Sequence, residues 1–265
     1  MDLLKRELAP LAQEAWDEID ERAVDVLKTH LSARKVVRVE GPKGWDFTSL
    51  SEGRLNILED DDAVVVKTGQ YKTKPLVETR IAFSLSRWEM DNILRGARDA
   101  NLEALEEAMK KMALFEENAV YNSYEKGGIQ GLVKSAEHKA VAFGESGSDI
   151  MAALSKAVLM MKESYQEGPF TLVVGEEGWK RLNTEVQGYP LMKRVKDIIG
   201  GEVVFSSVAK DALMVPYDHE DLELVIGGDF SIGYESHDAE NVNLFVAESF
   251  TFRVLDPALI VPFTL

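Results

Sequence analysis

Residues 45–76 restrict the fold of this chain more than any other segment. Two strand-like runs, Arg54 to Leu58 and Ala63 to Lys67, flank the acidic turn Glu59–Asp62. A two-stranded hairpin of this kind is marginally stable on its own in water. The segment therefore needs another surface to lie on, and a second subunit is one candidate for that surface.

The rest of the chain mixes helical and strand periodicities. Apolar residues recur at three- and four-residue steps over 11–31, 102–125 and 149–166, which predicts three amphipathic helices. Residues 77–85 and 242–254 alternate between apolar and polar side chains and predict two long strands. Shorter strands are expected at 35–40, 170–174, 202–206, 212–216 and 222–227, with helical pieces at 176–184 and 191–199. Because no βαβ repeat is present, we expect an α+β fold.

Composition narrows the class of protein. The chain has no cysteine, which excludes disulfides, thiolate metal sites and cysteine nucleophiles. Its net charge of −16 gives no general attraction to nucleic-acid backbones, although such acidity also simply maintains solubility. The charged start, Met1 to Glu7, lacks the apolar core of a signal peptide, and no apolar run is long enough to span a membrane. We expect a cytoplasmic protein that binds neither membrane nor nucleic acid.

No catalytic motif is apparent in the sequence. Gly144 to Ser148 approaches the nucleophile elbow G-x-S-x-G, but Ser148 replaces its second glycine, and we interpret Ser148 as a helix N-cap. The four histidines are not spaced as metal ligands: His30, His138, His219 and His237. We therefore expect no metal site and no enzyme activity.

Two acidic runs are expected to lie in solvent. The run Asp60–Asp62 lacks the spaced ligands and the glycine of a calcium loop, so we interpret it as a solvated turn. The pair Glu116–Glu117 is expected on a solvated helix face. Adjacent helical residues point about 100° apart, so this pair is not a carboxylate dyad.

Two further features have both a functional and a structural interpretation. Trp88 follows a predicted strand among charged residues, where it either marks an interface or stacking site or covers the strand end. Gly188-Tyr189-Pro190 forms a turn between two helical pieces. Such loop tips often carry function, and an ordinary surface turn is the alternative.

An ordered set of short motifs resembles the encapsulin shell proteins. The motifs include Leu4-Lys5-Arg6-x-x-Ala9-Pro10-Leu11, Glu40-Gly41-Pro42-x-Gly44-Trp45, Trp88-Glu89-x-Asp91-Asn92, Tyr189-Pro190-Leu191, Asp229-x-Ser231-Ile232-Gly233-Tyr234 and Glu248-x-Phe250-Thr251-Phe252. No single motif is specific, but together they span the chain in the family's order.

The resemblance implies the fold of tailed-phage major capsid proteins, of the Hong Kong 97 phage type. It divides the chain into an N-terminal helix with the start of a peripheral domain (1–44), an extended loop (45–76), the peripheral domain with its long helix (77–133), an axial domain (134–220) and return strands of the peripheral domain (221–265). The extended loop coincides with the hairpin that needs an external surface.

The resemblance also implies a function. Such chains are shell subunits that assemble with themselves, in 60 copies or a multiple, into an icosahedral nanocompartment. The shell encloses cargo enzymes through their C-terminal targeting peptides and serves iron storage or oxidative-stress chemistry. Cargo of this family includes ferritin-like proteins and dye-decolorising peroxidases.

Three sites follow from the resemblance. The expected cargo-peptide groove contains Leu27, Leu31, Arg34, Phe230, Ile232 and Tyr234, of which Leu27 and Ile232 are equally explained as core. The expected five-fold pore contains Gln187, Gly188 and Tyr189. No cofactor is required, but some family shells carry a flavin, and FMN or another flavin would stack on Trp88 near Arg80.

Two alternatives share parts of this interpretation. A prophage capsid protein that packages DNA would have the same fold, but the acidic balance speaks against it. A flavin-binding enzyme would use Trp88 as its stacking residue.

Overall fold

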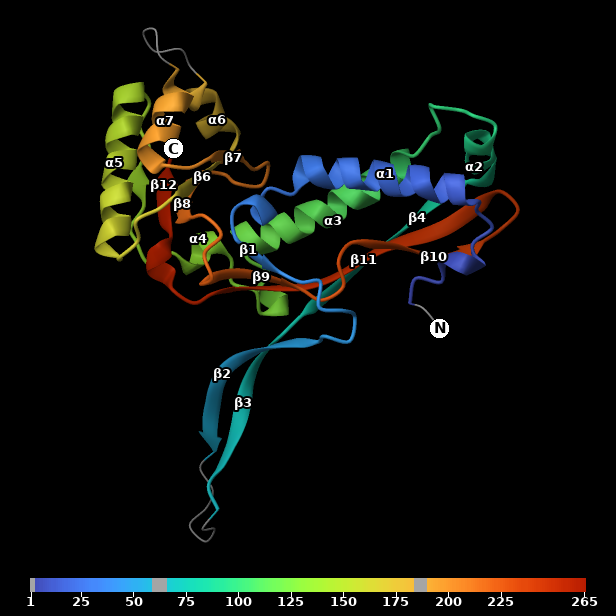
Figure 1. Cartoon of the computed structure of the whole chain (residues 1–265), viewed down its shortest axis with the longest axis horizontal. Helices are drawn as coiled ribbons and strands as arrows, with labels where there is room; N and C mark the ends of the chain where they lie inside the picture. Colours follow the sequence, from blue (N-terminus) through green and yellow to red (C-terminus); the bar gives the residue numbers. More distant parts are fainter. Residues whose placement is uncertain (1–2, 59–65, 184–189) are drawn as a thin grey trace.

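The computed structural model describes residues 3–58, 66–183 and 190–265. Figure 1 shows a long sheet that carries two helices on one face, a second unit of sheet and helices beside it, and a hairpin that projects away from both.

The first sheet is organised around its longest strand, β11 (Asn241–Val254). Along one edge β11 pairs with β4 (Val77–Ser86) over its first ten residues. Along the other edge it pairs first with β10 (Ser231–His237) and then with β9 (Leu222–Ile226). Strand β9 in turn pairs in parallel with the short β1 (Arg38–Glu40). The sheet therefore joins the early and late parts of the sequence.

Two helices cover this sheet because their apolar stripes face it. Trp16 and Ile19 of α1 (Gln13–His30) and Met109 of α3 (Glu103–Tyr121) share one buried cluster with residues of β4, β10 and β11. The short α2 (Arg87–Leu94) follows β4 directly. Short 3₁₀ turns lie at Arg6–Leu8 (η1), Ala33–Lys35 (η2), Glu125–Gly127 (η3) and Pro257–Leu259 (η4).

The second sheet has the order β5-β12-β8-β6-β7. Its strands are β5 (Val141–Ala142), β6 (Phe170–Val174), β7 (Val203–Phe205), β8 (Ala212–Pro216) and β12 (Val261–Thr264). Its helices are α5 (Gly147–Glu163), α6 (Glu176–Leu182) and α7 (Leu191–Ile199), and α4 (Leu132–Ser135) leads into it. Strands β6 and β8 are buried along their whole length.

One predicted boundary requires correction. We expected residues 221–265 to return entirely to the first unit, but β12 pairs with β8 and β5 of the second sheet. The physical reason is apolar burial, because Val261 and Phe263 pack into the core of the second unit, where Phe263 lies edge-on to Phe143.

The hairpin is a two-stranded sheet of its own, formed by β2 (Ser49–Leu58) and β3 (Thr68–Pro75). The predicted strand 54–58 lies within β2. The second predicted strand is wrong for residues 66–67, since β3 begins at Thr68, and its residues 63–65 lie outside the described residues, as does the acidic turn. Figure 1 shows the hairpin extending away from the rest of the chain, as the sequence suggested.

Other local details also differ from the expectations. Ser146, not Ser148, caps α5, because the Ser146 hydroxyl accepts a hydrogen bond from the Asp149 amide and the Asp149 carboxylate accepts one from the Ser146 amide. Strand β10 was not predicted from the sequence. A glycine lies within it, and the backbone of Gly233 lies directly beside the ring of Phe245 on β11.

We predict that Gly233→Ala destabilises the protein by about 1–3 kcal/mol, because the added β-carbon would lie 2.3 Å from the Phe245 ring. Chemical unfolding followed by tryptophan fluorescence measures this change. Glu235→Ala, at an exposed position of the same strand, is the matched control. Equal unfolding midpoints for the two variants would show that the ring can move aside.

Candidate functional site

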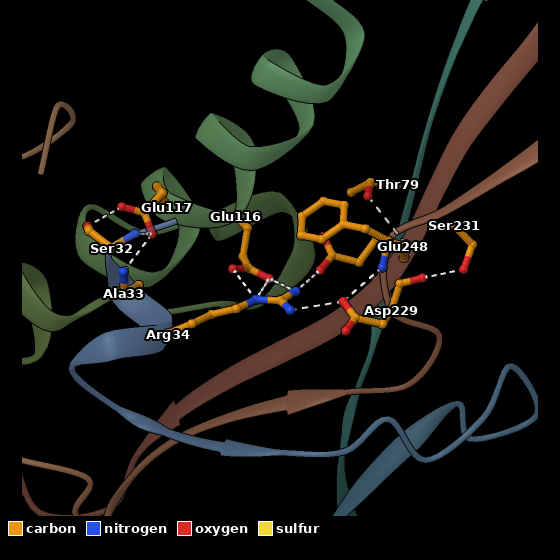
Figure 2. Close-up of polar contacts among 10 residues, drawn as sticks. Ser32, Ala33, Arg34, Thr79, Glu116, Glu117, Asp229, Ser231 and Glu248 are labelled. Atoms are coloured by element: carbon orange, nitrogen blue, oxygen red, sulfur yellow. Dashed lines mark hydrogen bonds and ion pairs between the residues drawn. The ribbon is translucent and has the colours of Figure 1, made fainter. Parts of the chain in front are cut away.

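A buried cluster of charged residues lies where four distant segments meet (Figure 2). Arg34, in η2 directly after α1, extends its guanidinium between the helix α3 and the strand β11. Its Nε and Nη2 donate to Glu116 of α3 at 2.9 and 2.6 Å. Nη2 also donates to Glu248 of β11 at 2.6 Å, and Nη1 donates to Asp229 before β10 at 2.9 Å.

Burial controls the protonation of this cluster. Glu116 and Glu248 are fully buried, whereas Asp229 is partly exposed. Burial, followed by the charge of Glu116 and a hydrogen bond with it, raises the pKa of Glu248 well above its usual range. Burial alone would lower the pKa of Arg34, but Glu116, Glu248 and Asp229 together raise it. Arg34 therefore stays charged, and its three acidic partners compensate its buried charge.

Glu117 performs a separate task on the other side of α3. Its carboxylate accepts hydrogen bonds from the amides of Ser32 and Ala33 at 2.9 and 2.7 Å, and from the Ser32 hydroxyl. Burial is the largest cause that raises the pKa of Glu117 to about 7, against the opposing effect of these donors. The expected solvated face for Glu116–Glu117 is thus wrong. The two side chains point about 100° apart, but each direction leads into protein rather than water.

The structure brings most of the predicted cargo-peptide residues together. Leu27, Phe230, Ile232 and Tyr234 belong to the apolar cluster between α1 and β10, where Ile232 is buried and the other three are partly exposed. Leu31 is buried at the end of α1. Leu27, Phe230 and Tyr234 are therefore the apolar members of this set that solvent reaches.

Arg34 belongs to the same region but has a different role from the one expected. Its guanidinium lies 4.9 Å from the centre of the Phe230 ring and is hydrogen-bonded to three carboxylates. Asp229 also accepts the Phe230 amide at 2.8 Å. Arg34 therefore positions the segment that carries Phe230, and its donors are already engaged by the protein.

The two predicted flavin residues lie on consecutive elements, Arg80 on β4 and Trp88 on α2. The Arg80 guanidinium lies 3.4 Å from the centre of the Phe245 ring. Trp88 lies in the first turn of α2, 68% exposed, with Arg95 at 5.7 Å from its ring. Six strand residues, or about 20 Å, separate Arg80 from the end of β4.

The remaining predictions concern the pore, metal binding and membrane spans. The expected pore residues Gln187, Gly188 and Tyr189 lie outside the described residues. Within residues 3–58, 66–183 and 190–265, no group of histidines and carboxylates is arranged to hold a metal ion. No helix in the described part of the chain is long and apolar enough to cross a membrane.

The buried Glu117 predicts a pH-dependent stability. A carboxyl whose pKa rises from 4.5 in the unfolded chain to about 7 in the fold favours folding most below pH 4.5, and this contribution is lost as pH rises through about 7. The corresponding loss is about 3 kcal/mol. We expect Glu117→Gln to abolish this slope, so that the variant gains stability relative to the natural protein between pH 4.5 and pH 8.

Urea unfolding at a series of pH values measures this difference. Glu107→Gln, on the exposed face of the same helix, is the control and should retain the natural slope. Parallel pH profiles for Glu117→Gln and the natural protein would contradict the buried titration.

Comparisons with known proteins place this geometry in a family. The family described as encapsulating protein for peroxidase matches residues 1–251. A type 1 encapsulin shell protein of Rhodospirillum rubrum is 36% identical over 99% of this chain and 96% of its own length. Another, of Mycolicibacterium paratuberculosis, is 32% identical over the full length of both chains.

Solved structures confirm the expected fold. The virus-like particle from Pyrococcus furiosus superposes with a TM-score of 0.67 at 16% identity, over 93% of this chain and 98% of that one. The capsid of Myoviridae Phage XM1 superposes with a TM-score of 0.60 at 10% identity, over 87% and 90%. The α+β architecture is that of the tailed-phage capsid proteins. The family match over residues 1–251 and the full-length relatives show that this chain belongs to the encapsulin shell protein family.

Proposed function

We propose that this protein is a structural shell subunit that assembles with itself into a closed icosahedral container. The observation that carries the proposal is the projecting hairpin, whose own chain leaves it uncovered. Closed shells of identical chains need contacts that extend well beyond each subunit's own core. Membership of the encapsulin shell protein family supports the same function.

The hairpin has an apolar face suited to such contacts. Leu55 pairs with Tyr71 and Ile57 pairs with Gly69 across the strands, so these side chains lie on one face. The side chain of Leu55 lies over Gly69, where a β-carbon would collide with it. Asn56 and Gln70 occupy the opposite, polar face. Exposed apolar faces of this kind mark protein interfaces.

We predict that the double variant Ile57→Asp, Tyr71→Asp folds but fails to assemble. These side chains are 67% and 77% exposed within the subunit, so the charges cost little there, whereas a covered interface would bury them. Gel filtration and electron microscopy measure assembly, and circular dichroism measures folding. Gln70→Asp, on the polar face, is the control.

Particles of the double variant that match those of the natural protein would remove the hairpin from the interface. A natural protein that remains a monomer or dimer under assembly conditions would contradict the shell function as a whole.

We also propose that the shell encloses a cargo enzyme, held by a C-terminal peptide in the groove between α1 and β10. Leu27, Phe230 and Tyr234 supply part-exposed apolar contacts, and the Arg34 cluster fixes the segment of Phe230. A ferritin-like protein or a dye-decolorising peroxidase fits the iron-storage or oxidative-stress function expected of the family. The cytoplasmic location, the absence of catalysis by the shell itself and the binding of a flavin stay predictions.

We expect Phe230→Asp to leave the shell intact and empty, because a carboxylate at this position opposes an apolar peptide. The variant is co-expressed with the gene of the proposed cargo enzyme, and mass spectrometry of the purified particles measures how much cargo they contain. Phe230→Leu, which keeps an apolar side chain, is the control and should load normally. Normal loading of Phe230→Asp would place the groove elsewhere, and DNA inside the particles would favour the capsid alternative.

A further inference from the structure

The N-terminal arm, residues 3–8, lies along the outer edge of β10. The backbone amide of Tyr234 donates a hydrogen bond to the carbonyl of Leu4 at 2.7 Å. The other edge of β10 is occupied by β11. The arm therefore contacts the first sheet through its backbone at Tyr234, one of the proposed groove residues.

The edge continues beyond the arm in the direction of the groove. In an antiparallel strand, alternate residues direct their backbone groups to opposite neighbours. Since Tyr234 directs its amide outward, Ile232, two residues earlier, also directs its backbone groups outward. The same edge then reaches Phe230, which shares an apolar cluster with Leu27 and Tyr234.

Trp16 and Asp20 of α1 hold the arm at Arg6, two residues after Leu4, and we call this contact the clasp. The Arg6 guanidinium lies 3.9 Å from the centre of the Trp16 ring and donates to Asp20 at 2.8 Å. A hollow of about 280 Å³ beside the clasp is lined by Arg6, Glu7, Trp16 and Asp20 and by residues between the arm and α1. The arm thus offers a backbone carbonyl to the sheet edge and, two positions later, a basic residue to an aromatic ring and a carboxylate.

The arm is lightly attached. None of the residues of η1 is buried, and Leu3 and Leu8 are exposed. The side chains of Arg6 and Asp20 are 31% and 46% exposed, so solvent screens their attraction. Lys5 has a φ of 49°, in the left-handed region that a β-carbon disfavours. A segment with so few buried contacts opens at low free-energy cost.

We propose that the arm occupies a peptide-recognition site and is displaced by its ligand. The site is the outer edge of β10 together with Trp16 and Asp20. The ligand is a peptide that accepts a backbone hydrogen bond from this edge and carries, two positions later, an arginine or lysine. Backbone hydrogen bonds to a sheet edge supply affinity, and side-chain contacts supply specificity. The inference rests on the proposed peptide capture and defines the chemistry of the captured peptide.

The arm itself is the probe that tests this site. A fluorescein-labelled peptide with the sequence of residues 1–8 is mixed with the protein in its native oligomeric state. The proteins are the full chain and a variant that lacks residues 2–8. We expect saturable binding to the shortened variant, and at least about tenfold weaker binding to the full chain, because the tethered arm competes at high effective concentration.

Charge variants test the clasp by fluorescence anisotropy. In the shortened protein, Asp20→Asn should weaken binding of the peptide about two- to fivefold. Asp17→Asn, at an exposed position one turn away on the same helix, is the matched control and should leave it unchanged. A peptide with the Arg6→Glu change should lose binding. No saturable binding to the shortened protein, equal affinity for both proteins, or equal affinity of the two peptides would overturn the proposal.

A second measurement applies if the shortened chain does not fold. In the full chain, Arg6→Glu breaks only the clasp, and hydrogen exchange should then become faster at the Tyr234 amide while the β4–β11 amides stay protected. Unchanged exchange at Tyr234 would contradict a displaceable arm. If the peptide displaces the arm but no particles form, this site stands and the shell function is refuted. If particles form but the peptide does not displace the arm, the shell function stands and this site is refuted.

Discussion

A single guanidinium, buried among carboxylates, is the interaction on which the arrangement of the first unit depends. Arg34 joins the turn after α1 to the helix α3, to the strand β11 and to the segment before β10. Removing one partner of such a buried group typically costs 3–5 kcal/mol, because the remaining charges keep no compensation. The segment that carries Phe230 is therefore held in place by the same cluster.

The raised pKa of Glu248 helps to explain how one arginine can compensate for three acidic side chains. Burial and the charge of Glu116 raise the pKa of Glu248, which favours its neutral form and reduces the negative charge that Arg34 faces. Glu117 satisfies the amides of Ser32 and Ala33, which lie in the buried turn and would otherwise lack acceptors. Both carboxyls thus stabilise the connection that places Arg34, and they make this connection sensitive to pH.

Sequence periodicity predicted α1, α3, α5, β4 and β11, because each buries one regular stripe or face. It missed β10, since Asp229 and Gly233 resemble loop residues until the Phe245 ring is seen beside the glycine. It also placed Glu116 and Glu117 in solvent, because no local pattern shows that Arg34 and Ser32 approach from 82 to 85 residues away. The groove residues followed from family resemblance, whereas the engagement of Arg34 and the arm on β10 required tertiary structure.

The pairing of β4 with β11 has a consequence for the timing of synthesis. Thr79 and Glu248 lie opposite each other although 169 residues separate them along the chain. A ribosome builds the chain from its N-terminus, so the hairpin emerges long before the strand that completes the first sheet. Pairing over such a separation is slow to form. A nascent chain therefore cannot present a finished first sheet until β11 has emerged from the ribosome.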